Sequence, residues 1–238
     1  MNILALDSSG LVASIAILQD DVVIGEYTTN YKKTHSQTLL PMLDEVVKMI
    51  DFDLNTLDAI AVASGPGSFT GLRIGSATAK GLGLALKKPI ISISTIEGLA
   101  NNLYYTQGLI CPIMDARRNQ VYTGVYKCDG SDMVQLISPC AISIDELIEK
   151  LKGMDGEVTF VGDGVPVFRE KLKDSLQSKC YFAPAHLSRQ RAGAIAVLGS
   201  KYYREGKVEN AVEHKPDYLR LSQAERELQE KQLRQAQE

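Results

Sequence analysis

The chain has 238 residues, a formal net charge of −3 and 45% hydrophobic residues. This length suits one large domain or two small ones, with enough apolar residues for a core. The slightly negative charge argues against a protein that binds nucleic acid by itself, so any RNA contact is expected through a partner. No apolar run is long enough to cross a membrane, and the start MNILALDSSG lacks the basic residues of a signal peptide. We therefore expect a cytoplasmic protein with no membrane contact.

The cysteine and histidine residues give no sign of a metal site. The cysteines are scattered without a CxxC pair, which favours reduced thiols over metal or disulfide roles. The histidines form no HExxH or HxxxH pair, so a histidine metal site is not expected. These residues are Cys111, Cys128, Cys140, Cys180, His35, His186 and His214.

Hydrophobic periodicity and turn residues divide the first half of the chain into alternating strands and helices. They predict three strands followed by a helix, a strand, a helix, a strand and a helix, at residues 2–7, 12–18, 22–29, 36–50, 57–63, 71–86, 90–94 and 95–105.

The second half repeats this order. The same element types are predicted at residues 109–115, 120–127, 133–139, 143–152, 157–161, 166–176, 180–182 and 188–205. Asp7 and Asp115 close the first strand of each half, and a glycine-containing turn follows each fourth strand. The sequence therefore predicts an α/β fold with a duplicated βββαβαβα unit, the architecture of actin-like and sugar-kinase-like ATPases, in which two lobes face each other across a cleft.

This organisation sets the expected boundaries. Residues 1–105 form the first lobe and residues 106–187 the second lobe. Residues 188–212 contain a helix that returns towards the first lobe. Residues 213–238 are expected to form an extended docking segment followed by a solvated tail rich in Gln, Glu and Arg.

The most distinctive stretch runs from Ser64 to Leu86 and reads SGPGSFTGLRIGSATAKGLGLAL. It matches neither a P-loop nor a GxGxxG fingerprint nor a nucleophile elbow. Small residues recur at every fourth position of its helix, at Gly71, Gly75, Ala79 and Gly83, so they share one face. Such a face permits close approach of another backbone. Two interpretations remain open, namely packing on the protein's own sheet or contact with another subunit.

Two loops resemble the phosphate loops of the actin-like superfamily. In the first lobe, the predicted nucleotide or phosphate contacts are Asp7, Ser8, Ser9, Gly65 and Gly67. The alternative is an inherited turn in which the acid caps nearby N–H groups. In the second lobe, Asp115 is followed by Arg117 and Arg118, which would crowd a nucleotide and favour a contact with a partner or within the chain.

Several segments resemble the TsaB (YeaZ) family over nearly the whole chain. They are residues 1–9, HSQTLLP at 35–41, SGPGSFTGLRIG at 64–75, MDARRNQVYTGVY at 114–126 and KPDYLRLSQAE at 215–225. The resemblance implies a subunit of the bacterial complex that forms threonylcarbamoyladenosine beside the tRNA anticodon. It implies that this subunit pairs with its paralogue TsaD, the transferase, and is joined by the ATPase TsaE. Contact with tRNA is then indirect, and a homodimer is expected for the isolated protein.

The resemblance implies that TsaD is bound through the first two helices, here residues 36–50 and 71–86. The predicted interface residues are Leu39, Leu43, Val46, Gly71, Ile74, Gly75, Thr78, Ala79, Leu82 and Gly83.

The resemblance also implies that this chain is not the enzyme of the complex. TsaD carries a metal-binding HxxxH motif, and the corresponding residues here are Thr95 and Leu99. Neither side chain supplies an imidazole, so we expect no metal, no catalytic residue and no required cofactor, with weak nucleotide binding as a possibility in the cleft. The alternatives are a stand-alone ATPase or kinase of the actin-like superfamily, or a peptidase.

Overall fold

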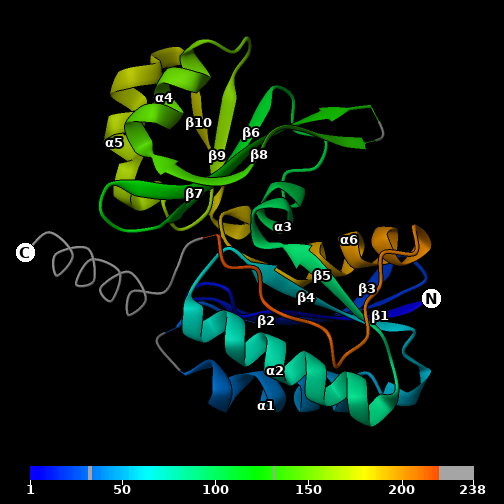
Figure 1. Ribbon diagram of the computed structural model, residues 1–238. Helices are drawn as coiled ribbons and strands as arrows, with labels where there is room; N and C mark the ends of the chain where they lie inside the picture. The colour runs from blue at the N-terminus through cyan, green and yellow to red at the C-terminus, as the bar shows by residue number, and fades with distance from the viewer. Residues whose placement is uncertain (32–33, 131, 220–238) are drawn as a thin grey trace, which may run out of the picture.

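A computed structural model describes residues 1–31, 34–130 and 132–219. The first half folds in the predicted order (Figure 1). Its elements are β1 (Asn2–Asp7), β2 (Ala13–Gln19), β3 (Val22–Thr29), α1 (His35–Met49), β4 (Ala59–Gly65), α2 (Phe69–Leu86), β5 (Ile90–Ser94) and α3 (Thr95–Asn101).

The second half repeats the unit. Its elements are β6 (Leu109–Asp115), β7 (Gln120–Asp129), β8 (Asp132–Ser143), α4 (Ile144–Lys152), β9 (Val158–Val161), α5 (Val165–Leu176), β10 (Cys180–Phe182) and α6 (Ala192–Arg204).

Two helix boundaries differ from the prediction by more than two residues. α3 ends at Asn101 rather than at residue 105, and Tyr105 lies in the left-handed region with a φ of 67°. α6 begins at Ala192 rather than at residue 188, because Ala185–Leu187 form a separate 3-10 turn and Arg191 is extended.

The two sheets have equivalent strand orders. The first sheet runs β3-β2-β1-β4-β5, and the second, read in the same sense, runs β8-β7-β6-β9-β10. In each, the central strand pairs antiparallel with the second strand of its unit and parallel with the fourth. This equivalence confirms the duplicated actin-like fold that element order predicts.

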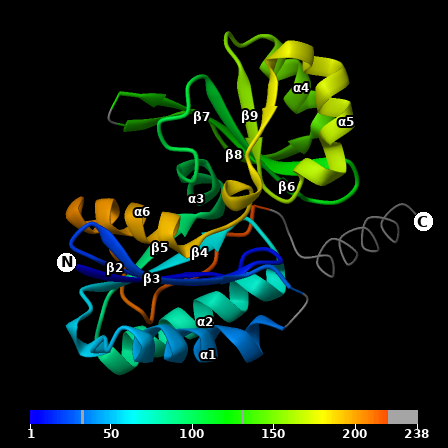
Figure 2. The ribbon, with the colours of Figure 1, turned by 180° about the vertical axis from the view of Figure 1, so that it is seen from behind.

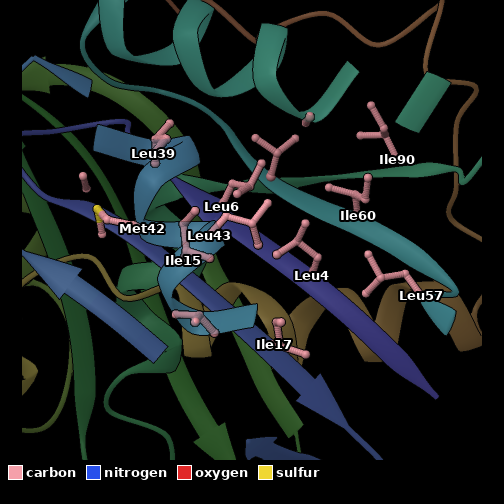
Figure 3. Close-up of a cluster of buried hydrophobic side chains, with 14 of the residues drawn as sticks. Leu4, Leu6, Ile15, Ile17, Leu39, Met42, Leu43, Leu57, Ile60 and Ile90 are labelled. Carbon is pink, nitrogen blue, oxygen red and sulfur yellow. The ribbon is translucent and has the colours of Figure 1, made fainter. Parts of the chain in front are cut away.

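Helices cover both faces of the first sheet. α1 and α2 pack on one face, where their apolar side chains join those of β1, β2 and β4 in a buried cluster (Figure 3). α6 packs on the other face over Ile3, Ala61 and Ile93 (Figure 2). Burial of this much apolar surface is the main stabilising contribution to the lobe.

In the second lobe, α4 and α5 cover the sheet face that carries Ile113 and Phe160. α3 lies between the two lobes, where Ile96 and Leu99 pack against Ile110 and Tyr126 of the second sheet (Figure 1). In the described part of the chain, no helix combines the length and apolar character needed to span a bilayer.

Candidate functional site

A cavity of about 490 Å³ lies where the loops of the two lobes meet. The first lobe contributes Ser68 and Phe69 at the start of α2. The second lobe contributes Asp115, Arg117 and Asp163. The predicted phosphate loops therefore face one opening, as the duplicated fold requires.

The first loop uses its acid internally. The Asp7 carboxylate accepts hydrogen bonds from the Ser9 backbone N–H at 2.9 Å and from the Ser9 hydroxyl at 2.6 Å. Asp7 is 1% exposed, and burial raises the pKa of its carboxyl group to about 6, while the Ser9 bonds oppose that rise. These contacts support the interpretation of Asp7 as the cap of an inherited turn.

Ser8 and the two turn glycines are also engaged within the chain. The buried Ser8 hydroxyl donates to the Gly71 carbonyl at 2.8 Å. A side chain at Gly67 would collide with the Ser9 carbonyl, and one at Gly65, where φ is 135°, would collide with the Asp217 carbonyl. Both glycines are thus explained by contacts of the chain with itself, and a nucleotide contact in this loop stays a prediction.

The second loop presents cations at the opening. The Asp115 carboxylate accepts from the Arg117 backbone N–H at 2.8 Å and lies 3.2 Å from the Arg117 guanidinium. Asp163 accepts from the Asp115 N–H at 3.2 Å, and burial raises the pKa of the Asp163 carboxyl group. The Arg117 side chain is 88% exposed. The loop therefore combines an intramolecular ion pair with exposed guanidinium groups.

The small-residue face of α2 packs on the protein's own chain. A Cβ at Gly75 would lie 2.5 Å from the Ser8 hydroxyl oxygen, and a Cβ at Gly83 would lie 2.9 Å from the Ala211 Cβ. Gly71 lies against the Ser8 carbonyl, and Ala79 is fully buried. For these four residues, the contacts support the first of the two interpretations, packing on the protein's own chain.

The other predicted interface residues differ in burial, and for those that are partly exposed a contact with a partner stays a prediction. Leu39, Leu43 and Val46 are buried in the cluster beneath α1. Ile74, Thr78 and Leu82 are only partly buried, but Ile74 and Leu82 pack against that cluster. Apolar spacing identified the face of each helix that the monomer covers, because packing on the sheet imposes the same period as packing on a partner.

The outer face of the α1–α2 pair has a different set of residues. Leu40 is 53% exposed and Leu84 is 54% exposed. Ala77 and Gly81 are exposed, and a Cβ at Gly81 would have no neighbouring atom within 4 Å. This outer face, defined by Leu40, Ala77, Gly81 and Leu84, is open to a partner. Sequence reasoning missed it because α2 has small residues on both of its faces.

Residues 208–219 form a C-terminal strap across the first lobe, visible as the orange segment below the sheet (Figure 1). Glu209 pairs with Ile90 through two backbone hydrogen bonds of 2.9 Å. Lys80 of α2 donates to the carbonyls of Val212 and His214 at 2.9 and 3.0 Å. The predicted docking segment therefore docks on its own lobe as far as residue 219, and the predicted tail at 220–238 lies outside the described residues.

The strap also brings a serine, a histidine and a glutamate together. The Ser92 hydroxyl lies 2.5 Å from a Glu209 carboxylate oxygen and 3.0 Å from His214 Nδ1. The same carboxylate oxygen lies 2.8 Å from His214 Nδ1. In a catalytic triad, serine and acid bind opposite ring nitrogens. Here both approach one nitrogen of a histidine that is 1% exposed, so the cluster anchors the strap.

The two residues that the family resemblance aligns with a metal motif, Thr95 and Leu99, lie in α3. Each is 1% exposed, and Leu99 belongs to the cluster between α3 and the second sheet. Within residues 1–31, 34–130 and 132–219, no three His, Cys, Asp or Glu side chains converge as metal ligands would.

The family model described as "TsaD: tRNA N6-adenosine threonylcarbamoyltransferase" matches residues 22–228. The chain is 39% identical to the tRNA threonylcarbamoyladenosine biosynthesis protein TsaB of Bacillus subtilis, over 94% of this chain and 96% of the relative. It is 30% identical to the protein of the same name from Escherichia coli, over 96% of this chain and 98% of the relative.

Solved structures agree with these relatives. YeaZ from Pseudomonas aeruginosa superposes with a TM-score of 0.77 at 26% identity, covering 92% of this chain and 99% of that one. A structure described as having similarity to peptidase YeaZ from Pseudomonas aeruginosa gives 0.80 at 27% identity, with the same coverage. Fold, sequence and length thus agree, and the chain belongs to the TsaB (YeaZ) family.

Proposed function

We propose that this protein is a non-catalytic subunit in the synthesis of threonylcarbamoyladenosine in tRNA, and that it binds and activates TsaD. Its relatives from two bacteria have names that describe this pathway, and they match it over nearly their whole length. The TsaD family model also matches most of the chain, which suits a pair of paralogues that associate.

One observation carries the non-catalytic part of the proposal. The family resemblance aligns Thr95 and Leu99 with TsaD's metal ligands; both are buried, and Leu99 packs between α3 and the second sheet. A hydroxyl group and an aliphatic side chain at these positions cannot replace two imidazole ligands. The loss of the ligands and the burial of their positions support a scaffold role.

The outer face of the α1–α2 pair is the proposed TsaD contact. Exposed leucines beside small residues allow a facing helix to approach closely and to bury apolar surface. In the absence of TsaD, the same face would pair two copies of this protein. TsaE would join the assembled pair, with no cofactor held by this chain, in the bacterial cytoplasm.

A stand-alone ATPase or kinase is the competing function. It needs phosphate loops with free N–H groups and an acid that faces the cleft. The contacts of Asp7 and Ser8 within their own lobe speak against it. A peptidase would need a nucleophile that contacts the free ring nitrogen of a histidine, which the Ser92–His214 geometry does not provide.

The experiment is a tRNA modification assay with TsaD, TsaE and a source of the threonylcarbamoyl adenylate, with and without this protein. We expect modification only when this protein is added, no ATP turnover by this protein alone, and no labelling of Ser92 by a fluorophosphonate. Robust ATP turnover without TsaD would favour the ATPase, and full modification without this chain would overturn the proposal.

A further inference from the structure

Arg117 lines the cavity between the lobes, and Arg73 and Arg118 lie next to residues that line it. Arg73 comes from α2, while Arg117 and Arg118 come from the loop between β6 and β7. The Arg73 guanidinium carbon lies 4.0 Å from the centre of the Phe69 ring, and Phe69 lines the same cavity as Arg117. Both lobes therefore present guanidinium groups near one opening, although the whole chain has a net charge of −3.

The acids at this opening neutralise only part of that charge. Asp115 pairs with Arg117, and the partly buried Asp163 lines the cavity. Asp217 is exposed in the strap beside Gly65. Within the described residues, the exposed Arg118 side chain has no hydrogen-bond or ion-pair partner. The arginines thus retain donors for an anion that arrives from outside.

The two arginines stand in a turn with an unusual backbone conformation. Arg117, Arg118 and Asn119 are consecutive left-handed residues with φ of 64°, 53° and 58°. This conformation costs an L-residue about 1 kcal/mol, and strain of this kind is concentrated at functional sites. Asn119 holds the turn by accepting from the Ile144 N–H at 3.1 Å and donating to Asp145 at 3.0 Å.

The first lobe adds a tilted pair of aromatic rings beside Arg73. The Phe69 and Tyr218 rings are 4.5 Å apart with an interplanar angle of 30°, and Arg73 donates to the Tyr218 hydroxyl at 3.2 Å. Tyr218 is 37% exposed. Guanidinium groups bind phosphates, and exposed aromatic rings stack on bases that are not paired.

We propose that this cleft rim, formed by Arg73, Arg117, Arg118 and the Phe69–Tyr218 pair, binds a single-stranded segment of the RNA substrate while this protein is paired with TsaD. This inference rests on the proposed function. Single-stranded RNA fits the combination of cations on both lobes and paired aromatic rings, whereas an acidic segment of a protein partner would use the cations alone.

The test measures binding of an unmodified tRNA transcript, and separately of a short single-stranded oligouridylate, to the TsaD complex of the full chain. The variant is Arg117→Gln with Arg118→Gln. We expect roughly tenfold weaker binding of both RNAs at 0.1 M salt and a salt slope that falls by about 1 to 2. Arg73→Gln, in the other lobe, should reduce the slope by about 1.

The matched control is Lys150→Gln with Lys152→Gln, which removes the same charge from exposed positions of α4 in the same lobe. Thermal unfolding verifies that every variant is folded, and TsaD association is measured without RNA. Unchanged RNA binding by the arginine variant would overturn the inference, as would weaker TsaD association with unchanged RNA binding, which would identify a protein contact. Failure of the wild-type complex to modify tRNA would instead count against the proposed function.

Discussion

The hydroxyl oxygen of Ser8 lies where a side chain at Gly75 would have to be, 2.5 Å from the position of a Cβ at that glycine. The first loop of the fold is thereby inserted beneath α2, and its hydroxyl donates to the Gly71 carbonyl one turn earlier. This loop thus holds a helix, and the helix keeps glycine to accommodate it.

Substitution of Gly75 tests this packing. We expect Gly75→Ala to lower the free energy of unfolding by about 1 to 2 kcal/mol, because Ser8 must move and lose its bond, which outweighs the propensity gain of alanine. Gly81→Ala is the matched control, since no atom lies within 4 Å of its added Cβ, and it should stabilise by up to about 1 kcal/mol. Urea denaturation measures both. Equal stabilities for the two variants would contradict the assignment, and Ser8→Ala should restore part of the loss in Gly75→Ala.

The buried Asp7 predicts a specific pH dependence. Its pKa is raised from 3.8 to about 6 in the folded protein, so the native state binds the proton more tightly than the unfolded chain. Its contribution to stability is therefore greatest below pH 4 and is lost as the pH rises from about 4 to about 6. Asp7→Asn keeps an oxygen acceptor for Ser9 and lacks this titration. We expect the free energy of unfolding of the variant, relative to that of wild type, to be about 2 kcal/mol higher at pH 7 than at pH 4. Denaturation at the two pH values measures it. A stability difference that is constant across this range would argue against a buried, titrating Asp7.

The strap is predicted to depend on Lys80. Lys80→Met removes two charge-assisted hydrogen bonds to strap carbonyls and should cost about 1 to 2 kcal/mol. Hydrogen exchange of residues 208–219 should become faster, while exchange in the second sheet stays unchanged. Lys48→Met serves as the control, because Lys48 is exposed and pairs only within α1. If both variants exchange alike, the strap does not depend on Lys80.

Sequence reasoning predicted the order of elements and the duplication because these depend on local patterns. Strand and helix periodicity, the acid at the end of β1 and β6, and the glycine turns are each read within a few residues. The burial direction of α2 was not determined, because small residues at every fourth position indicate a close approach without identifying the neighbour. The Ser8 hydroxyl, the Ala211 side chain and the Asp217 carbonyl are those neighbours, from loops far away in sequence.

Side-chain pairs between residues that are far apart in the sequence could not be predicted from it. Arg191 pairs with Glu26, and Arg73 with Tyr218, across separations of 165 and 145 residues. The candidate site was predicted in outline, since both acid-ended loops do meet at one cavity. The contacts of the residues in this site could not be predicted. Whether Asp7 faces a ligand or its own loop depends on the rotation of one side chain.

The most direct test of the account is the affinity of TsaD for the Gly81→Leu variant, measured by titration calorimetry. The added Cβ lies on the outer face of α2, where no atom of the monomer is within 4 Å, so thermal stability should be unchanged or, as for Gly81→Ala, slightly raised. We predict that TsaD binds this variant at least about tenfold more weakly, and that Glu170→Leu, which adds an exposed leucine on α5, binds like wild type. Wild-type affinity for Gly81→Leu would contradict the claim that this face of α1 and α2 is the TsaD contact.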